Sequence, residues 1–288
     1  MADLPEDDSS DISDSVELIP IPQPPRRVLL PVLLFVATCL TTLESQSLAY
    51  ALAIMTILLT HELGHFFQAV RYKVPASLPY FIPIPWKLSP IGTMGAVIGM
   101  KPGIGNRREL FDIGITGPLA GLVPALIFTI VGLRWSTVVS VDGPSKMLTL
   151  GEPLLFKALA YLNFGPLAEG QDIQLHDLAF AGWVGIFITA LNMFPIGQLD
   201  GGHTLYALLL KRSHIIAQGL LVAIMAAVTL FGYWQWSVMI ALVIMTGPRH
   251  PPTANDNMPL GTARTIIGWL ALLLVPLGFT PVPFSFPT

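Results

Sequence analysis

The feature that most constrains this chain is a series of long apolar runs that carry almost no charge. The runs fall at about 28–43, 48–70, 110–133, 178–194, 215–232, 235–247 and 264–280. A transmembrane helix needs about 20 mostly apolar residues, and here 53% of residues are hydrophobic and only 11% are charged. We therefore expect an all-α, polytopic, integral membrane protein of six or seven transmembrane helices, since the run at 235–247 is short for a full span.

The N-terminal stretch has a different character. Seven acidic residues precede the first basic residue, Arg26. A segment rich in Ser, Asp and Pro cannot bury enough apolar surface to fold, so we expect residues 1–25 to be a disordered acidic tail. A secretory signal would instead begin with basic residues. The interpretation leaves residues 26–280 as one transmembrane domain and residues 281–288 as a C-terminal tail.

Basic residues indicate how the spans are oriented and which partners the chain has. With the acidic tail inside and seven crossings, twelve Lys and Arg residues are cytoplasmic and three, at positions 134, 146 and 157, are outside. An excess of Lys and Arg in cytoplasmic loops is the usual pattern. We expect a cytoplasmic tail, with the inner membrane of a bacterium as the location and lipid as a partner. No basic patch interleaved with aromatic residues indicates nucleic-acid binding.

One polar motif interrupts the run at 48–70, and it has the pattern of a metal site. His61-Glu62-Leu-Gly-His65 places two imidazoles on the same face of a helix, where they can bind one Zn²⁺ with Glu62 beside them as a base. Without a partner, these side chains would cost several kcal/mol in hydrocarbon. The alternative is a set of hydrogen-bonded core groups, and the burial cost favours the metal site.

A catalytic zinc usually takes three protein ligands, so one more is needed. Asp200 is the best candidate, because it follows the apolar run at 178–194 at a Gly-rich break. On its own, an exposed turn aspartate is the more ordinary interpretation. Topology favours the interpretation of Asp200 as a zinc ligand. His61 lies about 14 Å from the cytoplasmic end of its span, at 1.5 Å per residue, and Asp200 follows a span that ends on the same side.

At these residues the chain resembles the site-2 proteases, which are intramembrane zinc metalloproteases. The His61–His65 segment is similar to the first motif of that family. Residues 192–201, Asn-x-x-Pro-x-x-x-Leu-Asp-Gly, are similar to its second motif, and residues 114–121 resemble the Gly-Pro segment of the helix between them. The resemblance covers residues 48–210, and it implies a three-helix zinc protease core there. Residues 134–177 are too short and too poor in strand patterns for the PDZ insertion of many members.

The resemblance implies a zinc metalloendopeptidase that cleaves transmembrane protein substrates in regulated intramembrane proteolysis. It implies one Zn²⁺ per chain on His61, His65 and Asp200, with Glu62 as the catalytic base. Asn192 would position substrate or stabilise the oxyanion, or it would join helices as a buried amide. Residues 91–100 resemble the family's membrane-associated β loop, which would either pair with substrate or be a purely structural re-entrant loop.

Two further questions stay open in the sequence. A transporter or channel for metal ions or protons would also bury His and Asp in the membrane, although it would not explain Glu62 beside His61. His203 either supports the metal site or faces solvent at the start of a helix. The histidines at positions 176, 214 and 250 lie near segment ends and are interpreted as surface residues. The sequence does not define the oligomeric state.

Overall fold

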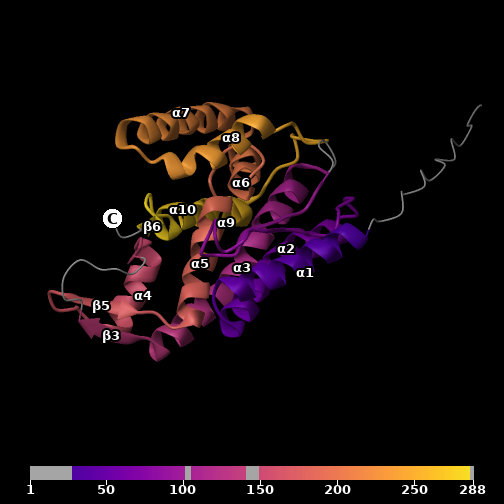
Figure 1. The fold of residues 1–288 in the computed structure, drawn as a ribbon. Helices are drawn as coiled ribbons and strands as arrows, with labels where there is room; N and C mark the ends of the chain where they lie inside the picture. The colour runs from indigo at the N-terminus through magenta and orange to yellow at the C-terminus, as the bar shows by residue number, and fades with distance from the viewer. Residues whose placement is uncertain (1–27, 101–104, 141–148, 286–288) are drawn as a thin grey trace, which may run out of the picture.

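The computed structural model describes residues 28–100, 105–140 and 149–285 (Figure 1). The predicted acidic tail, 1–25, lies outside the described residues, as do residues 286–288 of the predicted C-terminal tail. The helices are α1 (Leu29–Ser45), α2 (Leu48–Arg71), α3 (Arg107–Trp135), α4 (Leu154–Phe164), α5 (Asp177–Asn192), α6 (Asp200–Leu209), α7 (Ser213–Phe231), α8 (Ser237–Thr246), α9 (Thr262–Leu272) and α10 (Leu274–Gly278), with 3₁₀ turns at Leu210–Arg212 and Trp234–Trp236. The strands are β1 (Tyr80–Pro83), β2 (Thr93–Val97), β3 (Thr137–Ser140), β4 (Thr149–Leu150), β5 (Gln171–Gln174) and β6 (Phe284–Ser285).

Each predicted apolar run forms a helix or a pair of consecutive helices. Three helical stretches are long and apolar enough to cross a membrane, namely Leu48–Arg71, Arg107–Trp135 and Asp200–Phe231. The other apolar helices are shorter, at 10–17 residues. The chain is therefore a mostly helical membrane protein. The described residues also form three two-stranded sheets, which the expectation of helices with one β loop covered only in part.

The centre of the molecule is the packing of α2, α3 and α5, which lie together in Figure 1. Small residues allow α3 and α5 to approach closely: a Cβ added at Gly132 would lie 2.0 Å from the backbone nitrogen of Ala179. Membrane helices commonly associate through such small residues, because lipid gives them no hydrophobic reason to pack. Large side chains fill the space beside this crossing, and Trp183 and Tyr50 are fully buried there.

Strands β1 and β2 form an antiparallel hairpin in the segment before α3. The turn of the hairpin is tied to two helices, because the hydroxyl of Thr41 donates to the carbonyl of Gly92 (2.7 Å) and that of Tyr50 donates to the carbonyl of Ile91 (2.7 Å). The predicted loop at 91–100 thus contains β2, which pairs with β1 on one edge. These bonds hold the hairpin against α1 and α2.

The segment between α3 and α5 has more regular structure than its sequence indicates. Strands β3 and β5 pair in antiparallel register from Thr137 with Gln174 to Ser140 with Gln171, and α4 lies between them in the chain. These elements lie at the opposite end of the molecule from α6, α7 and α8 (Figure 1). The strands are only four residues long, which is too short for the alternation of polar and apolar residues to be recognised.

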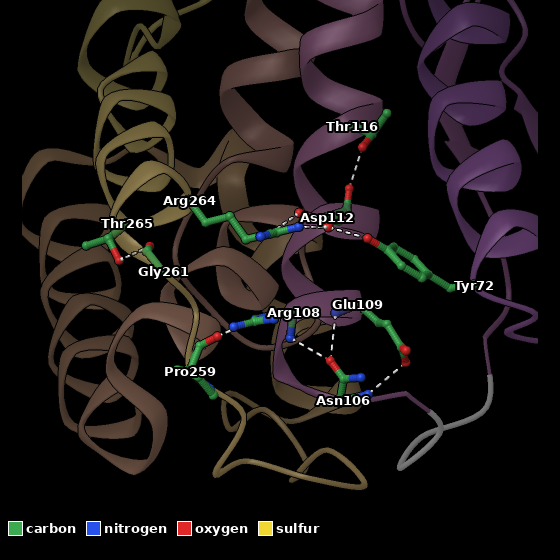
Figure 2. Close-up of polar contacts among 10 residues, drawn as sticks. All are labelled: Tyr72, Asn106, Arg108, Glu109, Asp112, Thr116, Pro259, Gly261, Arg264 and Thr265. Carbon is green, nitrogen blue, oxygen red and sulfur yellow. Dashed lines mark hydrogen bonds and ion pairs between the residues drawn. The ribbon is translucent and has the colours of Figure 1, made fainter.

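The segment from residue 247 to α9 wraps around the start of α3. The backbone nitrogen of Arg107 donates to the carbonyl of Asn255 (3.2 Å), and the side chain of Arg108 donates to the carbonyl of Pro259. One turn further along α3, Asp112 accepts two hydrogen bonds from Arg264 at the start of α9 (Figure 2). The C-terminal part of the chain is therefore attached to the helix that carries the Gly-Pro segment.

Candidate metal centre

Helix α2 presents two histidines and a glutamate close together within a mostly apolar helix. The side chain of Ser47 caps its start by accepting from the backbone nitrogen of Tyr50, which satisfies one of the free N–H groups there. His61, Glu62 and His65 are 4%, 3% and 6% exposed. The motif predicted from the sequence is thus on a helix and buried within the bundle.

Asp200 reaches the same place through a tight reversal of the chain. Helix α5 ends at Asn192, and Gly197 has a φ of +59° in the turn that precedes α6. The first turn of α6 packs directly on this reversal, since a Cβ added at Gly201 would lie 1.9 Å from the carbonyl oxygen of Met193. Asp200 is the first residue of α6, where the free N–H groups of a helix start favour a carboxylate.

The three predicted ligands converge on one point. The Nε2 atoms of His61 and His65 are 3.2 Å apart, and they lie 3.2 Å and 3.3 Å from the two carboxylate oxygens of Asp200. Three ligand atoms at about 2.1 Å from a tetrahedral zinc are separated by about 3.3 Å. Within the described residues, these side chains form the only group of three or more His, Cys, Asp or Glu that could hold a metal ion. The donor set and its spacing fit zinc.

A backbone carbonyl orients one of the histidines. Nδ1 of His65 lies 2.7 Å from the carbonyl oxygen of Ile113 on α3. A carbonyl only accepts, so Nδ1 carries the hydrogen and the neutral ring leaves the lone pair of Nε2 directed at His61 and Asp200. Metal-binding histidines commonly have such a partner on their second nitrogen.

The Gly-Pro segment of α3 provides the room that the site needs. Three of its glycines each face a side chain of the site: Gly114 faces His203, Gly117 faces His65, and Gly121 faces His61. A Cβ at these positions would lie 2.9 Å, 2.1 Å and 2.9 Å from atoms of the facing side chains. The segment that resembles the site-2 proteases therefore has a direct physical reason for its glycines.

A cavity of about 120 Å³ opens beside the three ligands. Glu62 and Asn192 line it, as do Ala96 and Val97 of the hairpin. The amide Nδ2 of Asn192 is 3.4 Å from Nε2 of His61. This volume is well above the roughly 10–15 Å³ that a cavity needs to hold one water, so the cavity can hold water. All the predicted site residues are thus in one place, with space for water and part of a substrate.

The structure decides between the two interpretations of His203 and corrects the interpretation of His250. His203 lines the cavity and its Nδ1 is 2.7 Å from Nε2 of His250, so it does not face solvent as one interpretation had it. His250 was expected at the surface but is only 8% exposed. The pair is separated by 47 residues in sequence, and no local pattern indicates such a contact.

Comparison with known proteins identifies the family. The profile of peptidase family M50 matches residues 49–233 of the chain. The curated protein "Probable zinc metalloprotease EGY1, chloroplastic" of Arabidopsis thaliana is 34% identical over 245 residues, which cover 82% of this chain and 43% of that protein. "Probable zinc metalloprotease EGY2, chloroplastic" of the same plant is 30% identical over 249 residues, covering 85% of this chain and 43% of that protein.

The chain thus spans less than half the length of these curated relatives. No solved structure gives a significant match to it. The comparisons confirm the resemblance to the site-2 proteases, and they do not support the alternative of a transporter or channel. The matched range includes the helices that carry all three candidate ligands and the Gly-Pro segment. The chain belongs to peptidase family M50.

Proposed function

We propose that this chain is an intramembrane zinc metalloprotease that hydrolyses peptide bonds in or near the transmembrane segments of membrane proteins. The observation that carries the proposal is the convergence of His61, His65 and Asp200, whose ligand atoms lie within 3.3 Å of a neighbouring ligand atom. Glu62 on the same helix turn supplies a base. The family and the names of the relatives support the same activity.

The roles of the side chains follow from their chemistry. His61, His65 and Asp200 would hold one zinc ion, which when bound supplies a Lewis acid that polarises a peptide carbonyl and acidifies water. Glu62 takes a proton from the attacking water as its oxygen bonds to the carbonyl carbon. Glu62 then gives that proton to the amide nitrogen as the C–N bond breaks, so that the products are a carboxylic acid and an amine.

Asn192 is suited to a role beside the reacting carbonyl. It is the last residue of α5 and lines the cavity. Its Nδ2 group is a hydrogen-bond donor without charge, and donors of this kind stabilise negative charge that develops on a carbonyl oxygen. We assign Asn192 to substrate positioning or oxyanion stabilisation.

The hairpin is the element suited to hold the substrate. One edge of β2 is paired with β1, and Ala96 and Val97 line the cavity. An extended peptide that adds to a strand edge exposes its scissile carbonyl to nearby groups. We propose that residues 91–100 form a membrane-associated loop that binds an unwound substrate segment at the edge of β2 opposite β1.

The arrangement in the membrane remains partly a prediction. Six or seven spans would require several of the shorter apolar helices to cross or enter the bilayer. The excess of Lys and Arg on one side supports the proposal that the site lies nearer the cytoplasmic face. The inner membrane of a bacterium stays a prediction, since the relatives named above are chloroplastic. Residues 26–280 as a single protease domain and residues 1–25 as a disordered tail also stay predictions.

The decisive experiment compares the purified chain with its Glu62→Gln variant in detergent micelles. The probe is a fluorescently labelled single-span peptide with a Gly-Pro break in its apolar segment. Wild-type protein with zinc should cut the peptide within or beside that segment. The variant should retain about one zinc per chain and lose activity by about 10²–10⁴-fold, the contribution of a catalytic base.

Two results would contradict the proposal. Cleavage by Glu62→Gln at the wild-type rate would show that Glu62 is not the catalytic base. Zinc-loaded wild-type protein that cuts no peptide in a panel of such single-span substrates would remove the protease activity. Glu44→Gln is a matched control at an exposed glutamate of α1, and it should cut the peptide at the wild-type rate.

A further inference from the structure

A hydrogen-bonded pair of histidines connects the cavity to a part of the chain that the family profile does not match. Nδ1 of His203, on α6, lies 2.7 Å from Nε2 of His250, in the segment after α8. The profile ends at residue 233, so His250 lies outside it. The two rings meet edge to face, with centroids 4.8 Å apart. The contact is specific and needs a chemical explanation.

The surroundings of His250 define which of its nitrogens carries the hydrogen. Its Nδ1 is 2.5 Å from the carbonyl oxygen of Pro251, which can only accept. The ring stacks on Tyr206 at 4.6 Å between centroids, and Asp256 and His214 are its other polar neighbours. Burial, and then the neighbouring His203, lower the pKa of His250 to about 3. The ring is therefore neutral, with hydrogen on Nδ1 and a lone pair on Nε2.

The tautomer of His203 follows from that of His250. Because Nε2 of His250 has only a lone pair, Nδ1 of His203 must donate to it, and the neutral His203 ring then carries a lone pair on Nε2. His203 lines the cavity and His250 does not. Because Nδ1 of His203 is engaged by His250, Nε2 is the nitrogen that this ring has left to offer to the cavity.

This lone pair is an acceptor in a cavity where a substrate brings donors. A transmembrane segment that unwinds for cleavage loses its helical hydrogen bonds, and each freed backbone N–H then needs an acceptor in low-dielectric surroundings. Of the other polar side chains that line the cavity, His61, His65 and Asp200 face one another and Glu62 has the role of base. Gln198 also lines the cavity, and its amide nitrogen donates to the carbonyl of Thr246 (3.2 Å). The lone pair on Nε2 of His203 would repel the negative charge that develops on the carbonyl oxygen. The role of His203 therefore differs from that assigned to Asn192.

We propose that His203 is a substrate-binding residue whose Nε2 accepts a hydrogen bond from one backbone N–H of the cleaved peptide, and that His250 is the positioning residue that holds His203 in this tautomer. The proposal rests on the protease function proposed above. It gives the segment after α8 a part in the site that is exerted through His203. It also identifies the chemical group of the substrate that is recognised, an amide N–H close to the scissile bond.

The test removes one backbone N–H of the substrate at a time. A cleavable single-span peptide is made in a series in which one amide near the scissile bond is replaced by an ester, which lacks the N–H. With wild-type protein, one position in the series should lower kcat/KM by about tenfold, as expected for one net hydrogen bond. With His203→Ala, the same ester should change kcat/KM by less than about twofold, because its acceptor is already absent.

Variants of His250 separate positioning from folding. His250→Gln keeps an acceptor close to the place of Nε2 and should retain the ester effect, whereas His250→Leu should lose it. Tyr206→Phe is the matched control: it keeps the ring that stacks on His250 and removes only the hydroxyl that donates to Asp256 (2.7 Å). This control should show the wild-type ester effect.

A second readout does not depend on cleavage. Solid-state NMR of protein with ¹⁵N-labelled histidine should show His203 and His250 as neutral rings protonated on Nδ1, and His250→Leu should change the tautomer of His203. The inference is overturned if every ester lowers kcat/KM as much in His203→Ala as in wild type. That outcome leaves the protease function intact. The NMR result of a His203 ring protonated on Nε2 also overturns it. Absence of cleavage by wild-type protein overturns the proposed function itself, and the substrate-binding role with it.

Discussion

Gly117 of α3 and His65 of α2 are in such close contact that no other residue fits at position 117. A Cβ there would lie 2.1 Å from Nε2 of His65, the atom that faces Asp200. The ring is held from its other side, because its Nδ1 is bonded to the carbonyl of Ile113. The position of this ligand is therefore defined by the absence of a side chain on the neighbouring helix.

The first prediction concerns this glycine. Gly117→Ala should displace the His65 ring and weaken zinc binding by about 10–100-fold, the range found when groups that support metal ligands are removed. Competition with a fluorescent zinc chelator measures the change. Gly219→Ala on α7 is the control, since a Cβ there has nothing within 4 Å. Wild-type zinc affinity in the Gly117→Ala variant would show that the histidine is not held in this way.

A second prediction concerns the carboxylate ligand. Asp200→Ala removes one of three ligands and should reduce the zinc retained after dialysis from about one per chain to well below half, while helical circular dichroism is unchanged. The amount of metal is measured by plasma mass spectrometry. The reason is that two imidazoles alone form a weaker and less closed site than the three ligands of catalytic zinc.

The control for this prediction is an aspartate in the same chain without a metal role. Asp172 is exposed on β5, and its carboxylate accepts a hydrogen bond from the neighbouring backbone nitrogen of Ile173. Asp172→Ala should bind zinc as wild type does. Full zinc occupancy in Asp200→Ala would show that this carboxylate is not a ligand.

Much of this site was predictable because its signals are local. The spacing of His61 and His65 places both on one helix face whatever the rest of the fold. The apolar runs predict the helices that they cover almost to their ends, whereas α4 and α6 lie outside every run. The prediction of Asp200 as the third ligand needed one further inference, which came from the orientation of the spans. The ligand set predicted in this way matches the group of three side chains that converge in the structure.

The contacts that the sequence did not indicate join distant segments. His203 with His250 and Asp112 with Arg264 are separated by 47 and 152 residues. Each residue alone fits a solvent-exposed interpretation, and only the packing of the C-terminal segment against α3 and α6 makes them partners. The short strands were missed because four residues hold too little alternation to be distinguished from loop.

A third prediction concerns pH. The pKa of His250 is lowered by burial to about 3, from 6.5 for an exposed ring. Below pH 6.5 the unfolded chain therefore binds a proton that the folded chain does not, so stability is complete above pH 6.5 and falls as the pH decreases towards 3. His250→Gln should remove this contribution, which is at most about 1.4 kcal/mol per pH unit. Unfolding in detergent at pH 7.5 and 5.5 measures it, and an equal loss in wild type and variant would contradict it.

The last prediction concerns the ion pair between α3 and α9. Arg264 donates two hydrogen bonds of 2.8 Å to the carboxylate of Asp112, which also accepts from the hydroxyl of Tyr72 at 2.5 Å (Figure 2). The Asp112 side chain is 14% exposed and that of Arg264 is 36% exposed, so solvent screens the pair only in part. Arg264→Gln removes the charge and the two N–H groups that donate to Asp112, and it leaves that largely buried carboxylate with the hydroxyl of Tyr72 as its remaining side-chain donor. We expect the free energy of unfolding to fall by about 1–2 kcal/mol.

Unfolding in mixed micelles with increasing dodecyl sulfate measures this loss. The matched control is Lys157→Gln, because Lys157 and Glu152 form a pair of similar length, 2.8 Å, whose side chains are 63% and 67% exposed. Such exposed pairs contribute little, since solvent screens them and two long side chains lose freedom. The control should therefore be as stable as wild type. Equal stability of Arg264→Gln and wild type would mean that the packing of α9, rather than its arginine, holds the C-terminal segment on α3.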